Sequence, residues 1–118
     1  MKEIPEIADF LRGLPGFDQL DDALLASCAK RIEIAYYRQG DDILTIGDEN
    51  RRLHIIRSGA VELRNEAGEM MAQLAERDVF GFPSLMNNRT AGNSSVALED
   101  TLIYHLDGEA FTRARHEN

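Results

Sequence analysis

The chain has 118 residues, a length that fits one domain with a substantial core, and its hydrophobic fraction of 43% is that of a folded protein. No apolar run is long enough to span a membrane, and the amino-terminal residues lack the apolar stretch of a signal peptide. The formal net charge of −8 argues against nucleic acid or an anionic membrane as a partner.

Helical periodicity marks the amino-terminal quarter of the chain. Apolar residues recur at helical spacing from Ile4 onward and predict an amphipathic helix over residues 4–13. Asp21 is the predicted N-cap of a second helix over residues 22–31.

The single cysteine lies on the apolar face of the second predicted helix. Cys28 has no neighbouring histidine or acid that would make it a nucleophile, so we expect a small buried apolar residue. One cysteine also excludes an internal disulfide and fits a reducing, cytoplasmic location.

After Ile32 the apolar period changes from 3.6 to 2, and glycines separate a series of short segments. Such spacing is typical of an all-β sandwich or barrel, here over residues 32–106, and Asp107 is then the predicted cap of a terminal helix over residues 108–118. The predicted strands lie near residues 32–37, 43–46, 53–57, 60–64, 70–74, 79–80, 94–98 and 101–106. The residues expected to be buried by their strand phase are Ile55, Val61, Leu63 and Phe80.

One stretch of the β region, residues 79–96, is the expected functional centre. Gly81 lets the backbone turn sharply and approach a ligand, because glycine has no Cβ. About one helical turn is expected to follow, and its free N–H groups would suit an anion. No acidic residue follows Gly81, however, and Arg89 is the only basic side chain of the stretch.

Four motifs together resemble those of the cyclic-nucleotide-binding domain family. They are Tyr37-x-x-Gly40-Asp41-x-Ile43-x-x-x-Gly47-Asp48, Leu53-x-Ile55-Ile56-x-Ser58-Gly59-x-Val61-Glu62-Leu63, Asp78-Val79-Phe80-Gly81, and Val96-Ala97-Leu98-Glu99-Asp100-Thr101. The resemblance covers nearly the whole chain. It implies a mainly β fold with flanking helices, a β-roll or jelly-roll-like double-stranded β-helix.

The same resemblance implies where a ligand would bind. In the family, the ligand's phosphate is held by a short helix after the Phe-Gly step, the phosphate-binding cassette. Carried onto this chain, the candidate ligand-binding residues are Gly81, Phe82, Pro83, Ser84, Leu85, Arg89, Asn93 and Ser94. The polar side chains of the stretch would suit a different, less charged ligand, although such residues are also ordinary in caps and turns; they are Ser84, Asn93, Ser94 and Ser95.

Two departures from the family pattern weaken the cassette. Binding members follow the Phe-Gly step with a glutamate that accepts the ribose hydroxyl, and this chain has Phe82 there. They also place an arginine before the final cassette strand, where this chain has Gly92 or Asn93. We therefore expect no tight binding of cyclic AMP or cyclic GMP, and a cyclic nucleotide or other small nucleotide-like molecule stays the expected class of ligand.

No enzymatic site is predicted. The three histidines, His54, His105 and His116, include no His-x-His pair, and the first two lie on different predicted strands, so neither a metal site nor catalytic residues are expected. The chain looks most similar to the first module of bacterial proteins that add paired CBS domains and a nucleotidyltransferase-like domain. We therefore expect a piece of a longer protein.

Two functions are consistent with these features. The first is a regulatory, ligand-sensing module that signals to domains following it in the same chain. The alternative is a ligand-free module that acts by homodimerisation or docking. In the first, Phe111 of the terminal helix is expected to pack against the roll and to help pass the signal onward.

Overall fold

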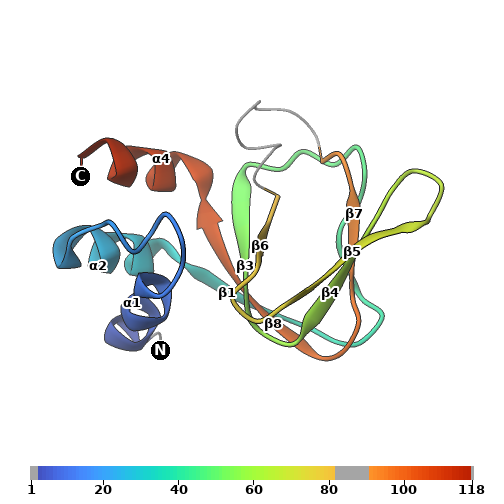
Figure 1. Ribbon diagram of the computed structural model, residues 1–118, viewed down its shortest axis with the longest axis horizontal. Helices are drawn as coiled ribbons and strands as arrows, with labels where there is room; N and C mark the ends of the chain where they lie inside the picture. Colours follow the sequence, from blue (N-terminus) through green and yellow to red (C-terminus); the bar gives the residue numbers. More distant parts are fainter. Residues whose placement is uncertain (1–2, 82–90, 118) are drawn as a thin grey trace. The chain divides into compact units, whose positions relative to one another are not determined.

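The computed structural model describes residues 3–81 and 91–117, with side chains up to residue 114 (Figure 1). The chain forms two compact units. The helical unit comprises Met1–Ile32 and Leu106–Asn118, and the β unit comprises Glu33–His105.

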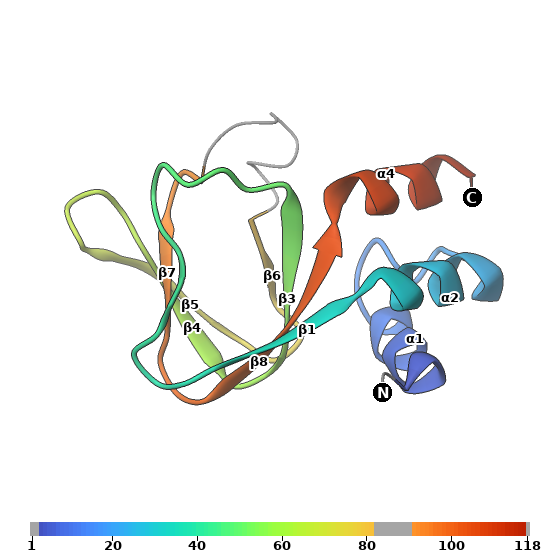
Figure 2. The ribbon, with the colours of Figure 1, turned by 180° about the vertical axis from the view of Figure 1, so that it is seen from behind.

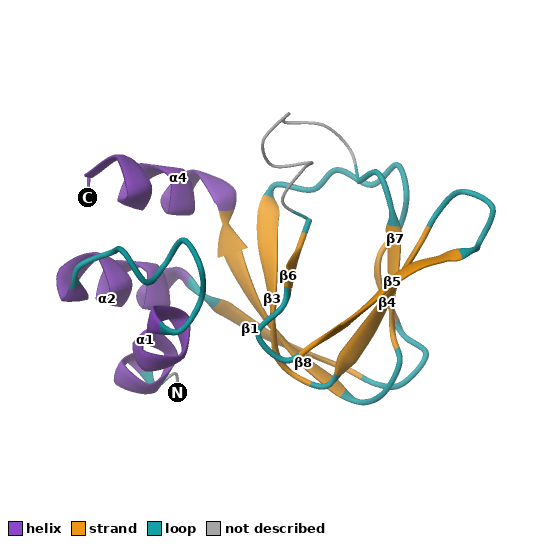
Figure 3. Cartoon of the chain, in the orientation of Figure 1, coloured by secondary structure: helices purple, strands orange, loops and turns teal. Residues whose placement is uncertain are grey.

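The helical unit contains three helices, purple in Figure 3. They are α1 (Ile4–Arg12), α2 (Asp22–Arg31) and α4 (Gly108–Glu117), and α2 contacts both of the others. Both predicted caps are confirmed. The backbone N–H of Leu24 donates to Asp21 Oδ1 at 2.8 Å, and that of Glu109 donates to Asp107 Oδ1 at 2.8 Å.

Aromatic stacking joins α4 to the loop between α1 and α2. The ring centroids of Phe17 and Phe111 lie 4.8 Å apart, and both rings are buried. Phe111 is thus buried as predicted. The ring that it meets is Phe17 of its own unit, and its predicted packing against the roll stays a prediction.

The β unit consists of two four-stranded antiparallel sheets, seen from behind in Figure 2. Their strand orders are β1-β8-β3-β6 and β2-β7-β4-β5, and the predicted β-roll is confirmed. The strands are β1 (Glu33–Tyr37), β2 (Asp42–Leu44), β3 (Arg52–Ser58), β4 (Ala60–Arg64), β5 (Met70–Ala75), β6 (Val79–Phe80), β7 (Ser94–Ala97) and β8 (Thr101–Asp107).

A compact apolar cluster forms the core of the roll. Its fully enclosed members are Ile56, Val61, Phe80 and Ile103. The predicted burial of Ile55, Val61 and Phe80 is confirmed, whereas Leu63 is only half-buried and packs at the margin of the cluster.

Strand β1 presents its largest apolar residues to solvent. Ile34 and Tyr36 are 46% and 60% exposed, whereas Tyr37, of opposite phase, packs against the core cluster. In the sequence, Ile34 and Tyr36 form the more apolar phase of this strand, and the structure instead turns Tyr37 toward the core.

Candidate functional site

The loop between β6 and β7 begins at a conformation that requires glycine. Gly81 follows Phe80 with φ of +87°, and a Cβ placed there would lie 2.6 Å from Cδ2 of His54 and 2.9 Å from Nδ2 of Asn50. The side-chain amide of Asn50 donates to the Gly81 carbonyl at 3.3 Å. The backbone therefore runs directly over two polar side chains at this point.

The end of this loop is held by the same part of the chain. The N–H of Ala91 donates to the Asp48 carbonyl at 2.8 Å, and the N–H of Gly47 donates to the Ala91 carbonyl at 3.1 Å. Ile46 N–H donates to Ser94 Oγ at 3.0 Å. The connection between β2 and β3, residues 45–51, thus holds both flanks of the loop.

Three of the predicted ligand-binding residues lie in the described part of the chain. Gly81 is at the start of the loop, Asn93 is exposed, and Ser94 is half-buried with its hydroxyl engaged by Ile46. The others, Phe82, Pro83, Ser84, Leu85 and Arg89, lie outside the described residues. The short helix expected after Gly81 also lies there.

One buried hydroxyl beside the loop has no partner within the described part of the structure. Ser95 is 1% exposed, and its Oγ makes no hydrogen bond there. Ser95 pairs in register with Leu63 of β4, whose side chain borders the core cluster. A buried, unpaired hydroxyl is costly, so Ser95 is a candidate contact for a neutral polar group.

A series of hydrogen-bonded polar side chains, here called the side-chain series, crosses the β1-β8-β3 sheet and ends at Gly81. Tyr37 Oη lies 3.0 Å from His105 Nε2, and His105 Nδ1 lies 2.8 Å from His54 Nδ1. His54 Nε2 then lies 2.9 Å from Asn50 Oδ1. The two imidazoles are 2% and 3% exposed, so this network replaces water for both rings.

The two ends of the side-chain series fix the position of every proton in it. The Arg52 backbone N–H can only donate, and it does so to Asn50 Oδ1 at 3.2 Å, while the Gly81 carbonyl can only accept. The amide orientation of Asn50 is therefore fixed, and His54 must donate from Nε2.

The donor and acceptor roles of the remaining side chains follow from the proton on His54 Nε2. Neutral His54 then accepts at Nδ1, so His105 donates from Nδ1 and accepts at Nε2 from the Tyr37 hydroxyl. All donors thus run in one direction, from Tyr37 to Gly81.

Burial keeps both histidines neutral at physiological pH. Desolvation, followed by the neighbouring charges of His105 and Arg52, lowers the pKa of His54 to about 3. Desolvation, followed by the Arg52 charge, lowers the pKa of His105 to about 4. The neutral, directional form described above is therefore the relevant one.

Sequence reasoning did not bring these two histidines together. They meet because β3 and β8 are neighbours in the sheet, although the strands are far apart in the sequence. A usable signal was present: His54 shares its phase with Ile56, and His105 shares its phase with Ile103, both of the core. Among the described residues, no group of three or more metal-binding side chains could hold an ion.

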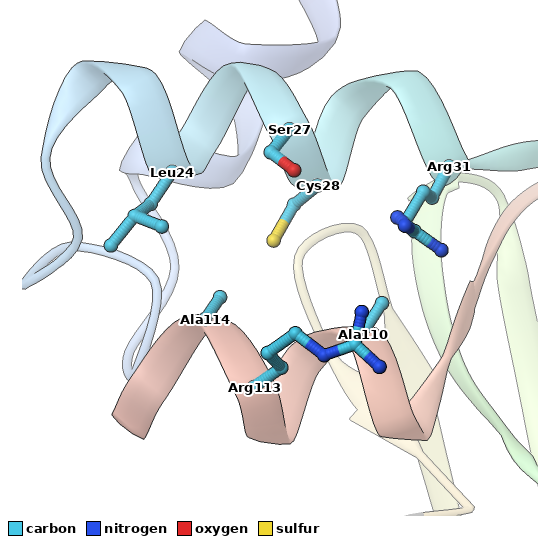
Figure 4. A pocket seen from close by; sticks show the side chains of 7 residues that line it. All are labelled: Leu24, Ser27, Cys28, Arg31, Ala110, Arg113 and Ala114. Carbon is cyan, nitrogen blue, oxygen red and sulfur yellow. The ribbon is translucent and has the colours of Figure 1, made fainter. Parts of the chain in front are cut away.

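A separate hollow lies in the helical unit between α2 and α4 (Figure 4). Its volume is about 130 Å³, well below the roughly 300 Å³ at which small-molecule pockets begin. Cys28 borders it, and burial raises the pKa of its thiol, against the smaller effect of Arg31. The predicted burial of Cys28 is confirmed, and this hollow is too small for a nucleotide.

The antiparallel roll, its flanking helices and a β6–β7 loop held at both ends define the class of β-roll ligand-binding domains. Residues 34–118 match the family described as "Cyclic nucleotide-binding domain", and the chain belongs to that family. It is a cyclic-nucleotide-binding-type regulatory domain. None of the helices in the described ranges is long and apolar enough to cross a membrane.

Curated relatives include regulatory subunits of protein kinases. The chain is 27% identical over 105 residues to the cAMP-dependent protein kinase regulatory subunit of Candida albicans, covering 89% of this chain and 23% of that protein. Its identity to the corresponding subunit of Mycosarcoma maydis is 29% over 112 residues, covering 88% and 21%. The chain thus spans about a quarter of the length of these relatives.

Solved structures share the fold. A cAMP-bound PfPKA-R structure has a TM-score of 0.83 at 26% identity and covers 96% of this chain and 42% of that chain. The catabolite activator protein of Thermus thermophilus has a TM-score of 0.75 at 28% identity and covers 87% and 50%. A regulatory subunit of a cAMP-independent protein kinase A from Trypanosoma brucei, 22% identical, has a TM-score of 0.87 with coverages of 96% and 42%.

Proposed function

We propose that this domain is a non-catalytic regulatory module that senses a small nucleotide-like ligand and has lost tight binding of cyclic AMP and cyclic GMP. The observation that supports this most directly is the chemistry flanking the loop. Residues 91–95 read Ala-Gly-Asn-Ser-Ser and contain no cation to neutralise a cyclic phosphate. They do contain the buried hydroxyl of Ser95, which has no hydrogen-bond partner among the described residues.

The two side chains of the family pattern that this chain lacks would each contribute substantially to the free energy of ligand binding. The family pattern pairs an arginine with the phosphate and a glutamate with the ribose, and this chain has Gly92 or Asn93 and Phe82 instead. Losing one charge-assisted pair and one further hydrogen bond costs about 4 kcal/mol together, which is about a thousandfold in affinity. A neutral ligand such as a nucleoside avoids the first of these losses, because it carries no phosphate.

The output of the module would pass through its terminal helix. Strand β8 runs directly into α4, and the cap at Asp107 forms at that junction. In the proposed mechanism, occupancy of the roll changes the state of α4, which passes the change to domains that follow in a longer, cytoplasmic protein. By resemblance to bacterial relatives, these would be paired CBS domains and a nucleotidyltransferase-like domain.

A ligand screen tests the proposal. Cyclic AMP, cyclic GMP, adenosine, guanosine and the corresponding monophosphates are added separately, and the melting temperature is measured, since any ligand that binds only the native state raises it. We expect a rise with one of the less charged compounds and none with cyclic nucleotides at micromolar concentration. A calorimetric dissociation constant below about 10 μM for cyclic AMP, near −7 kcal/mol, would overturn the proposed loss.

The alternative function, homodimerisation or docking without a ligand, is favoured by a different observation. Ile34 and Tyr36 on edge strand β1, and Met70 and Met71 at the start of β5, are large apolar residues more than 45% exposed. A molecular mass that doubles with concentration in sedimentation, together with no thermal shift from any compound of the panel, would establish this alternative.

A further inference from the structure

We propose that the side-chain series Tyr37–His105–His54–Asn50 holds the backbone at Gly81 in position. Asn50 is the residue through which the series acts on Gly81. The proposal rests on the proposed function in one respect, namely that the loop that begins at Gly81 serves ligand binding. The positioning itself is a property of the described residues and is measurable without any ligand.

His54 and Asn50, the last two members of the side-chain series, pack directly against the backbone at Gly81. The His54 ring stacks on Phe80, with centroids 5.0 Å apart, and lies where a Cβ at position 81 would be. Asn50 accepts from His54 and from the Arg52 backbone on one side and donates to the Gly81 carbonyl on the other. A displacement of either side chain therefore changes the hydrogen bond at Gly81 directly.

The direction of the hydrogen bonds distinguishes the side-chain series from ordinary core packing. Apolar side chains could fill the same volume, and burying two imidazoles costs free energy that apolar residues would not incur. What an apolar pair cannot supply is a second donor at Asn50 Oδ1, which adds to the Arg52 backbone N–H in holding the amide in the orientation that faces Gly81. The histidines therefore contribute orientation, which is a property that a loop-positioning element needs.

A specific pair of tautomers follows from the geometry. His54 carries its proton on Nε2, and His105 carries its proton on Nδ1. Long-range proton–nitrogen NMR of the full chain at pH 7 shows directly which ring nitrogen carries the proton in each histidine. If His105 is instead protonated at Nε2, the side-chain series does not run toward Gly81, and the proposal is wrong.

Two substitutions test the positioning, each at one end of the side-chain series. Asn50→Asp keeps the acceptor for His54 and for the Arg52 backbone but removes the donor to Gly81, so the Gly81 carbonyl carbon resonance should move upfield. Tyr37→Phe removes the first donor, and the matched control is Tyr36→Phe, on the same strand but 60% exposed.

The expected result is that Tyr37→Phe shifts the His105 ring nitrogens and, by a smaller amount, the Gly81 carbonyl, whereas Tyr36→Phe shifts neither. If the Gly81 resonance responds to Asn50→Asp but not to Tyr37→Phe, Asn50 acts alone and the histidine pair is only core filling. If Asn50→Asp does not fold, the tautomers of the unsubstituted chain still decide the direction.

The compound panel described above, applied to the same variants, separates this inference from the proposed function. We expect any compound that stabilises the unsubstituted chain to stabilise Asn50→Asp less and Tyr36→Phe equally. If no compound stabilises the unsubstituted chain, the proposed function fails, while the ligand-free resonance of Gly81 still confirms or refutes the positioning.

Discussion

The buried histidine pair makes the stability of this domain depend steeply on mildly acidic pH. Both rings have folded-state pKa values well below the value of 6.5 for the unfolded chain, about 3 for His54 and about 4 for His105. Below pH 6.5 the unfolded chain binds protons that the folded chain excludes, so the free energy of unfolding falls as the pH falls. The contribution is fully present above about pH 7 and is lost progressively toward the folded pKa values.

The change in the free energy of unfolding between pH 7 and pH 5.5 depends almost entirely on proton binding by the unfolded chain. In the unfolded chain each histidine is about 24% protonated at pH 7 and about 91% protonated at pH 5.5, whereas in the folded chain it stays neutral. Each histidine therefore lowers the free energy of unfolding by about 1.3 kcal/mol over this interval. Two such residues cost about 2.5 kcal/mol, a large fraction of the 5–15 kcal/mol typical of a domain. Arg52, whose charge lowers the pKa of both rings, and its ion-pair partner Glu33 are unchanged in the variant described below.

Urea unfolding at the two pH values measures this difference. The comparison is between the unsubstituted chain and a variant carrying His54→Gln and His105→Gln, which has the same carboxylates and no titrating ring in the roll. We expect the variant to lose about 2.5 kcal/mol less than the unsubstituted chain over the interval, whatever its absolute stability. Equal losses would mean that the two rings are already protonated or accessible in the folded state, and the neutral, directional side-chain series would be refuted.

Two further substitutions test the backbone and the helical core. Gly81→Ala should cost more than about 2 kcal/mol, because its Cβ would collide with His54, whereas Gly68→Ala, at φ of +80° with open space around it, should cost only the backbone term of about 1 kcal/mol. Equal costs in urea unfolding would show that the loop shifts freely at Gly81. Phe111→Ala should lower the free energy of unfolding by about 3 kcal/mol and the exposed control Thr112→Ala by less than about 0.5 kcal/mol. An unchanged melting temperature for Phe111→Ala would mean that α4 is not docked in its unit.

Much of the fold could be predicted from the sequence, because its signals are local. Glycine-separated alternation located the strands to within a residue or two, and Asp21 and Asp107 are caps in the structure as predicted. The faces of β1 were not evident from its sequence, since Ile34 and Tyr36 form the more apolar phase, whereas Tyr37 faces inward and contacts His105 and the core cluster.

The candidate site was predictable only in part, because its supporting contacts are not local. The resemblance identified the loop at Gly81, but Asn50 and His54 meet Gly81 and His105 only because β3 lies between β8 and β6 in the sheet. Asn50 lies in a turn-rich stretch where asparagine is ordinary, so nothing in the local sequence marked it as a contact of Gly81.

The anchoring of the β6–β7 loop from a separate connection has an evolutionary consequence. The groups that hold its two flanks belong to residues 46–50, outside the loop itself. The nine positions 82–90 are thus free to change in sequence without removing any of these anchors. Ligand preference in such a domain can therefore diverge by exchange of a short segment while the roll stays the same, and a loop transplanted from a relative is a practical route to a new sensor.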